Sequence, residues 1–266
     1  HNRWQCASHH PRRTFTLKTG TIFEDSPIGP DKWLPAMWQV VNCKNGVSSY
    51  EVHRAIGVTQ KTAWFMDHRI RLALGLDSSD KLCGEVEVDE TFIGGKARNM
   101  HQSKREQRIH GTGGKDKVPV MGFLERGGEV RTAVVDSRKK GVLQSEVRNN
   151  VSAGAALYSD ALASYEGLDG EFFHQVVDHA VEYVRGRVHT NGLENFWSLV
   201  KRGLKGTYVS VEPFHLFRYL DEQAYRFNNR KLTDSERFSI AVASIVGKRI
   251  MWDELTGKTD AGDRPN

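Results

Sequence analysis

An alternating segment in the first half of the chain constrains the fold more than any other feature. In the run EVEVDETFI (85–93), Val86 and Val88 point to one face of a β-strand, while Glu87 and Asp89 share the other face. The two valines predict that this strand packs on a hydrophobic core. A pair of carboxylates on an otherwise apolar strand needs a separate explanation. Taken alone, an Asp is more often a cap or turn residue than a catalytic one.

Further short β-rich runs follow this strand. They are KVPVMGFLE (117–125), EVRTAVVD (129–136), AALYSD (155–160) and FFHQVVD (172–178). Helical patterns occur between and after them, at GVLQSEVRNNV (141–151), NGLENFWSLVKRGL (191–204) and PFHLFRYLDEQAYRFNN (213–229). Three strands in succession, then a helix, then a strand predict a mixed sheet with helices packed on it. The expected fold class is therefore α+β (mixed α/β).

The preceding residues, 31–76, have the pattern of helices joined by short turns. Ser48 or Ser49 can cap one helix, Gly57 can end it, and Thr59 can cap a second helix. This spacing is typical of a helix-turn-helix DNA-binding motif, and the alternative is an ordinary pair of antiparallel helices. The second helix would present four side chains to DNA: Gln60, Lys61, Thr62 and Arg69.

The charge of the chain is unevenly distributed. Lys and Arg number 38 against 33 Asp and Glu over 266 residues, and 13 of the basic residues lie between positions 96 and 148 with only 6 acidic ones. The stretch 97–117 has no apolar periodicity and predicts a mobile basic loop, either a solvated connector or a tether for a polyanion such as DNA. Its candidate phosphate contacts are Lys104, Arg105, Arg108 and Lys115.

The chain lacks the sequence features of membrane and secreted proteins. No run of 18 apolar residues occurs, and the basic N-terminus has no apolar core of a signal peptide. The three cysteines are odd in number and far apart, which favours a reducing compartment. Cys6 with His9 or His10 has the spacing of half a zinc site, and the alternative is a flexible histidine-bearing terminus.

The helical pattern at 191–204 has two distinct stripes. Five apolar side chains form one stripe: Leu193, Phe196, Trp197, Val200 and Leu204. Four polar side chains form the neighbouring stripe: Asn191, Glu194, Ser198 and Lys201. Such a helix can pack on a sheet while it presents amide, carboxylate and ammonium groups to one place. The alternative is a solvated face with an incidental Glu–Lys pair.

The spacing of three acidic residues adds a family resemblance. Asp89 and Asp160 enclose 70 residues, and Asp160 and Glu194 enclose 33. This spacing, together with VDETFIGGK, YSDALASY, HTNGLENFWSLVKRGLKGTY and TGTIFEDSPIGPDKW, resembles bacterial insertion-sequence DDE transposases of the ISXO2-like family. These are built from a zinc ribbon, a helix-turn-helix and an RNase-H-like core. In parts of the family an Asn takes the third acidic place, and here Asn191 and Glu194 both remain candidates.

The resemblance implies a domain order. Residues 1–24 would be a truncated zinc-ribbon remnant or N-terminal arm, 25–80 the helix-turn-helix region, 81–250 the catalytic domain and 251–266 a C-terminal tail. The chain does not begin with Met, so we expect a fragment or a processed form. Zinc would be bound only if the ribbon were completed.

The resemblance also implies a chemistry. Asp89 and Asp160 would hold Mg²⁺ or Mn²⁺ with Glu194 or Asn191, while Lys201, Arg202 and Lys205 would contact phosphates. The expected partners are double-stranded DNA, as terminal inverted repeats and as target, and further copies of the chain in a homodimer or higher homo-oligomer. The expected location is the bacterial cytoplasm, at the nucleoid. The competing hypotheses are a metal-dependent nuclease of the same fold and a non-catalytic DNA-binding regulator.

Overall fold

The structure is a computed structural model that describes residues 3–8, 13–76, 80–94, 102–103, 117–160, 163–177 and 189–257. The chain divides into two compact units. One, the helical unit, comprises His1–Gly75 and Leu232–Asn266, and the other, the sheet unit, comprises Leu76–Lys231. In the described ranges, no helix combines the length and the apolar character that crossing a bilayer requires.

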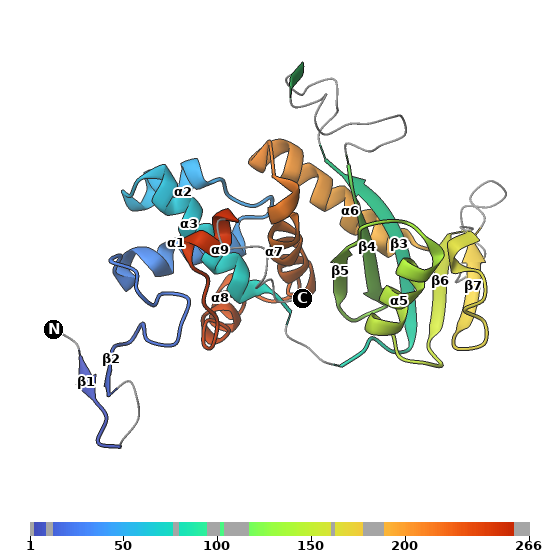
Figure 1. Cartoon of the computed structure of the whole chain (residues 1–266), viewed down its shortest axis with the longest axis horizontal. Helices are drawn as coiled ribbons and strands as arrows, with labels where there is room; N and C mark the ends of the chain where they lie inside the picture. The colour runs from blue at the N-terminus through green and yellow to red at the C-terminus, as the bar shows by residue number, and fades with distance from the viewer. Residues whose placement is uncertain are drawn as a thin grey trace. The chain divides into compact units, whose positions relative to one another are not determined.

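The helical unit contains a short hairpin and five helices in its described part (Figure 1). The hairpin pairs β1 (Trp4–Gln5) with β2 (Thr14–Phe15), antiparallel. The helices are α1 (Pro30–Asn42), α2 (Ser49–Ile56), α3 (Gln60–Leu74), α8 (Asp234–Ala243) and α9 (Trp252–Thr256).

Local capping determines where α2 and α3 begin and end. Ser48 and Glu51 form a reciprocal capping box at the start of α2, and Gly57 ends this helix in the left-handed region at φ 63°. Thr59 then starts α3 by accepting a hydrogen bond from the backbone N–H of Thr62, at 3.1 Å. The predicted pair of helices joined by a tight turn is therefore confirmed.

The C-terminal helices α8 and α9 pack in this same unit. Trp38 of α1 meets Phe238 of α8 edge to face at 5.3 Å between ring centroids, and Trp64 of α3 meets Trp252 of α9 at 6.0 Å. The family resemblance predicts a catalytic domain over residues 81–250. The structure instead groups the residues of α8 with the N-terminal helices, because these aromatic contacts are long-range and leave no local signal in the sequence.

The prediction that Arg69 is exposed for DNA contact is wrong. Its side chain is buried, and Nη1 donates hydrogen bonds to the carbonyl oxygens of Ile22, at 2.9 Å, and Glu24, at 2.7 Å. The reason is that the segment preceding α1 covers this part of α3. Arg69 therefore ties two parts of the helical unit together.

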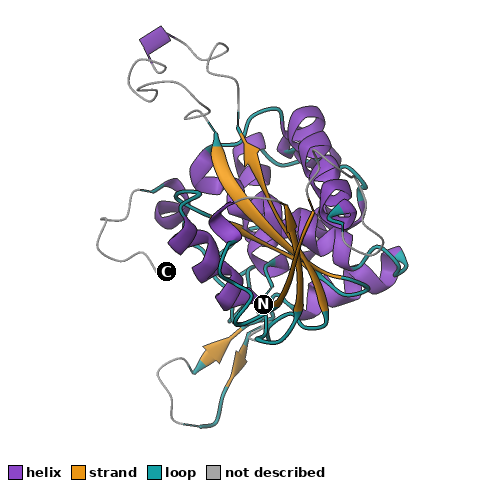
Figure 2. Ribbon diagram, turned by 90° about the vertical axis from the view of Figure 1, so that its right-hand side faces the viewer, coloured by secondary structure: helices purple, strands orange, loops and turns teal. Residues whose placement is uncertain are grey.

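The sheet unit is built on one mixed five-stranded sheet. Its strands are β3 (Glu85–Ile93), β4 (Val118–Glu125), β5 (Val130–Val134), β6 (Ala156–Asp160) and β7 (Phe173–Val177). Their order is β5-β4-β3-β6-β7: the β5–β4 and β4–β3 pairs are antiparallel, and the β3–β6 and β6–β7 pairs are parallel. The strands twist strongly relative to one another (Figure 2). The predicted α+β class with an RNase-H-like core is confirmed.

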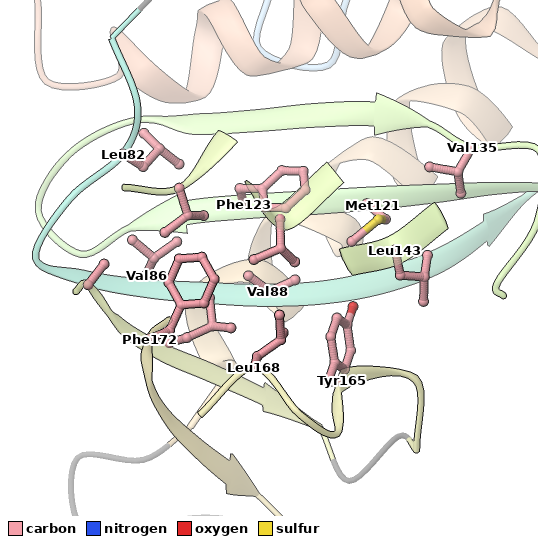
Figure 3. Packing of buried hydrophobic residues seen from close by; sticks show 14 residues of the cluster. Leu82, Val86, Val88, Met121, Phe123, Val135, Leu143, Tyr165, Leu168 and Phe172 are labelled. Carbon is pink, nitrogen blue, oxygen red and sulfur yellow. The ribbon is translucent and has the colours of Figure 1, made fainter. Parts of the chain in front are cut away.

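Helices cover both faces of this sheet, and each face has its own hydrophobic core. On one face, α5 (Lys140–Asn150) packs through Leu143 and Val147 on a cluster that includes Val86 and Val88 (Figure 3). On the other face, α6 (Asn191–Gly203) and α7 (Leu216–Asn228) form the second cluster. Because Val86 and Val88 fill the first core, Glu87 and Asp89 face α6, as the alternation predicted.

Candidate active site

Asp89 and Asp160 lie side by side on neighbouring strands. The parallel register pairs Val88 of β3 with Ser159 of β6, so the next position on each strand places the two carboxylates on the same face of the sheet. Burial and, after it, the negative charges of Asp160 and Glu90 together raise the pKa of Asp89 to about 7. This pair is thus a site of concentrated negative charge.

A pocket of about 540 Å³ opens between β3 and α6. It brings together Asp89 and four residues that the sequence predicted for the site: Glu194, Lys201, Arg202 and Lys205. Asn191, the first residue of α6, is not among the residues that line this pocket, and neither is Asp160, which ends the neighbouring strand. Of the two candidates for the third acidic place, Glu194 therefore shares the pocket with Asp89.

The pocket has an acidic and a basic side. Asp89, Glu90 and Glu194 supply carboxylates, and three exposed cations follow one another on α6 and the π-helical turn after it (Leu204–Tyr208): Lys201, Arg202 and Lys205. Carboxylate oxygens are the ligands that hard divalent cations prefer, and Lys and Arg bind phosphate oxygens. The arrangement can therefore hold a cation beside a phosphodiester backbone.

Helix α6 lies unusually close to the sheet at Asp89. Asp89 pairs with Gly122 across the β3–β4 register, and a Cβ atom at Gly122 would lie 2.6 Å from Cζ2 of Trp197. The missing side chain leaves room for the indole ring. The Nε1–H of Trp197 then donates a hydrogen bond to Oδ2 of Asp89 at 3.0 Å.

Glu87 holds the first turn of the same helix. Its side chain is only 2% exposed; Oε2 accepts a hydrogen bond from the backbone N–H of Leu193 at 3.1 Å, and Oε1 one from Nε of Arg126 at 3.0 Å. Nδ1 of His189 lies 3.4 Å from Oε1 of the same carboxylate. A carboxylate is favourable at a helix N-terminus, where the backbone N–H groups have no partner within the helix.

The sequence did not indicate Glu90 as part of the site. Glu90 lines the pocket, although its position in β3 puts it on the opposite strand face from Asp89. Burial raises the pKa of Glu90, while Arg138, whose Nε lies 3.6 Å from Oε1, acts in the opposite direction. By strand alternation Glu90 falls on the face of Val86 and Val88, and only the tertiary structure shows that it also reaches the pocket.

The donor set fits a magnesium ion bound by few protein ligands. In the described ranges, no group of three or more His, Cys, Asp or Glu residues is close enough to form a complete protein-only metal site. Mg²⁺ commonly takes one or two carboxylates and keeps its other positions for water and substrate oxygens. The Asp89–Asp160 pair meets that requirement, and a dication would offset both the burial and the repulsion by Asp160 that raise the pKa of Asp89.

The other predicted contacts fall in the helical unit or outside the described residues. Nε2 of Gln60 donates to Oγ of Ser49 at 2.9 Å, and Lys61 is exposed with Nζ 4.5 Å from the centroid of the Trp252 ring. The basic residues predicted for the 97–117 loop, and the histidines predicted beside Cys6, lie outside the described residues: Lys104, Arg105, Arg108, Lys115, His9 and His10.

Comparison with known proteins identifies the family. Residues 81–228 match the ISXO2-like transposase domain. The chain is 30% identical over 202 residues to an uncharacterized protein in the transposable element ISH50 of Halobacterium salinarum, covering 72% of this chain and 68% of that protein. It is also 31% identical over 105 residues to an uncharacterized transposase-like protein of Haemophilus influenzae, covering 39% of this chain and 85% of that protein. The domain match spans more than half of the chain and contains every residue of the pocket, so the chain belongs to the ISXO2-like transposases.

Proposed function

We propose that this transposase binds the ends of a mobile DNA element and catalyses metal-dependent DNA cleavage and strand transfer. The observation that carries the proposal is the pocket between β3 and α6, in which the carboxylate of Asp89 faces a row of cations. A phosphodiester has to be held and its developing charge stabilised, and both kinds of group are present in this pocket.

The proposal gives roles to five residues of the pocket and to Asp160 on the strand beside it. Asp89 and Asp160 would hold the divalent cation, Mg²⁺ or Mn²⁺, and Glu194 would face it from the helix. A bound cation would supply the means to activate the attacking oxygen and to stabilise the leaving one. Lys201 and Arg202, together with Lys205, bind the phosphates on either side of the scissile bond and so align the DNA strand with the carboxylates.

In this proposal, the helical unit recognises the DNA sequence. The start of α3 carries Gln60, Lys61 and Thr62, and a helix that opens on polar and basic residues can reach base edges in the major groove. The basic residues of the 97–117 segment add contacts to phosphates that do not depend on sequence. Cleavage at both ends of an element implies two or more copies of the chain on DNA, at the bacterial nucleoid.

A cleavage and joining assay tests the function. The purified chain is incubated with Mg²⁺ and DNA that carries the element's ends, and the products are sequenced. We expect strand breaks at the ends and joined products, and we expect Asp89→Asn and Asp160→Asn each to abolish both while DNA binding measured by gel shift persists.

The same assay separates the competing functions. Breaks without joined products would indicate a nuclease of the same fold. Binding without any break, in the unmodified chain, would indicate a DNA-binding regulator. Cleavage at the normal rate in either Asn variant would contradict the assignment of the carboxylates.

A further inference from the structure

We propose that Trp197 is a positioning residue for Asp89: its indole N–H holds one carboxylate oxygen and leaves the other for the divalent cation. This inference rests on the proposed function, since it assumes that Asp89 is a metal ligand. The hydrogen bond from Nε1 of Trp197 to Oδ2 of Asp89 measures 3.0 Å, and both residues line the same pocket. A donor that restrains a ligating carboxylate orients it for the metal.

The indole ring is itself immobilised. Trp197 is 3% exposed and belongs to the hydrophobic cluster between α6, α7 and the sheet. The Phe196 ring lies 5.1 Å from it between centroids. A buried aromatic ring packed on several sides keeps one rotamer, so its N–H points in one fixed direction. The carboxylate of Asp89 therefore receives its hydrogen bond from a rigid donor.

Gly122 provides the space that this contact needs. It occupies the position opposite Asp89 on β4, and a Cβ atom there would come within 3.1 Å of two ring atoms of Trp197 and within 2.9 Å of Cδ2 of Leu193. These distances are below ordinary van der Waals contact. Any larger residue at position 122 would push the indole, and with it α6, away from Asp89.

The spacing of β3 and α6 explains why both contacts form at once. Two residues of a strand span about 6.6 Å, and four residues of an α-helix span about 6 Å. Glu87 and Asp89 are two residues apart on β3, and the groups that donate to them, the N–H of Leu193 and the indole of Trp197, are four residues apart on α6. The helix is thus fixed to the strand at two matched points.

The size of the effect follows from comparable metal sites. Loss of a hydrogen-bond partner that orients a ligand typically costs 10–100-fold in metal affinity or activity. We therefore expect Trp197→Phe, which keeps an aromatic ring but deletes the N–H, to weaken Mg²⁺ binding by about tenfold or more. A Trp residue that only fills the core would leave the affinity unchanged, because Phe preserves most of the packing.

Isothermal titration with Mg²⁺ on the full chain tests the inference without any DNA or turnover. The matched control is Trp33→Phe, because Trp33 is also fully buried and its Nε1 donates one hydrogen bond, to Oγ of Ser26 at 3.2 Å, in the helical unit. We expect the control to bind Mg²⁺ like the unmodified chain. Asp89→Asn serves as the reference for a lost ligand.

Fluorescence gives a second, independent measurement. Trp197 is the only tryptophan in the sequence between residues 76 and 231, and its N–H donates to the carboxylate that binds the ion. We expect Mg²⁺ to change the tryptophan emission of the unmodified chain and of Trp33→Phe, and to leave that of Trp197→Phe unchanged. Gly122→Ala, which keeps the indole but displaces it, should weaken Mg²⁺ binding as Trp197→Phe does.

The outcomes separate this inference from the proposed function. If the unmodified chain and Asp89→Asn bind Mg²⁺ equally or not at all, the metal site of the proposed function is wrong and the inference falls with it. If binding depends on Asp89 while Trp197→Phe and Gly122→Ala bind normally, the proposed function stands and the positioning role is overturned. Circular dichroism verifies that each variant is folded, and if Trp197→Phe does not fold, the result for Gly122→Ala decides.

Discussion

The surroundings of Glu87 and Asp89 differ sharply, although the two carboxylates lie two residues apart on the same face of the same strand. Glu87 is buried with the guanidinium of Arg126, the ring of His189 and the N-terminus of α6 as its partners. Asp89 forms no salt bridge with any residue in the described part of the chain. Its side chain instead accepts a hydrogen bond from the neutral indole of Trp197. The charged groups that act on its pKa, Asp160 and Glu90, are both negative.

The difference teaches that partners, and not strand position, separate a carboxylate whose charge is compensated within the protein from one whose charge is not. A buried carboxylate with a cation and a helix N-terminus stabilises the fold, because its charge is compensated within the protein. A buried carboxylate next to other carboxylates lowers stability until a cation arrives from outside. Glu87 thus holds the helix that carries Glu194 and the basic residues, and Asp89 remains available to bind.

The largest expected effect comes from neutralising the structural carboxylate. Glu87→Gln removes the buried charge that pairs with the partly buried guanidinium of Arg126 at 3.0 Å and leaves only its longer contact with Glu85, at 3.5 Å. Breaking a buried pair costs about 3–5 kcal/mol, and we expect the lower end of that range here. In a unit of this size we expect the melting temperature to fall by about 10 °C, measured by circular dichroism in EDTA. Asp89→Asn, two residues away, should not lower it.

The matched control for this variant is Glu171→Gln. Glu171 forms an ion pair with Arg148 in the same unit, but both side chains are more than 40% exposed. Exposed pairs contribute about 1 kcal/mol or less, so the control should melt close to the unmodified chain. If Glu87→Gln melts like the control, the structural role that we assign to Glu87 is wrong.

An intermediate effect is expected on the helix side of the pocket. Glu194 lines the pocket with Asp89, whereas Asn191 does not, and a carboxylate attracts a dication more than an amide does. We expect Glu194→Gln to raise the Mg²⁺ concentration for half-maximal cleavage by at least about tenfold, and Asn191→Ala to raise it less. An inactive Asn191→Ala beside an active Glu194→Gln would reverse this assignment.

The last prediction concerns pH, where the effect is spread over about three pH units. Asp89 has a folded-state pKa of about 7 against an ordinary value of 3.8, so the folded chain binds more protons than the unfolded chain between these pH values. Its contribution to stability therefore falls as pH rises from about 4 to about 7. In EDTA, the melting temperature of the unmodified chain should decline relative to that of Asp89→Asn over this interval. If the two melting temperatures change in parallel with pH, the pKa of Asp89 is not raised in the folded chain.

Much of the fold could be predicted because its signals are local. The alternation of Val86 and Val88 with acidic residues predicted both the strand and its two faces, and Gly57 and Thr59 predicted the turn between α2 and α3. Arg69 shows the limit of such reasoning. Its place on α3 predicted exposure, but residues 45 and 47 positions earlier in the chain cover it.

The sequence by itself determined which groups can do chemistry here: the spacing of Asp89, Asp160 and Glu194, and the basic residues that follow on the same helix. Only the tertiary structure decided which carboxylate is neutralised and which is left to bind, because that depends on Arg126, the start of α6 and the indole of Trp197. These partners lie 39 to 108 residues away along the chain. Charge compensation in a buried site depends on distance in space, and a linear pattern does not record that distance.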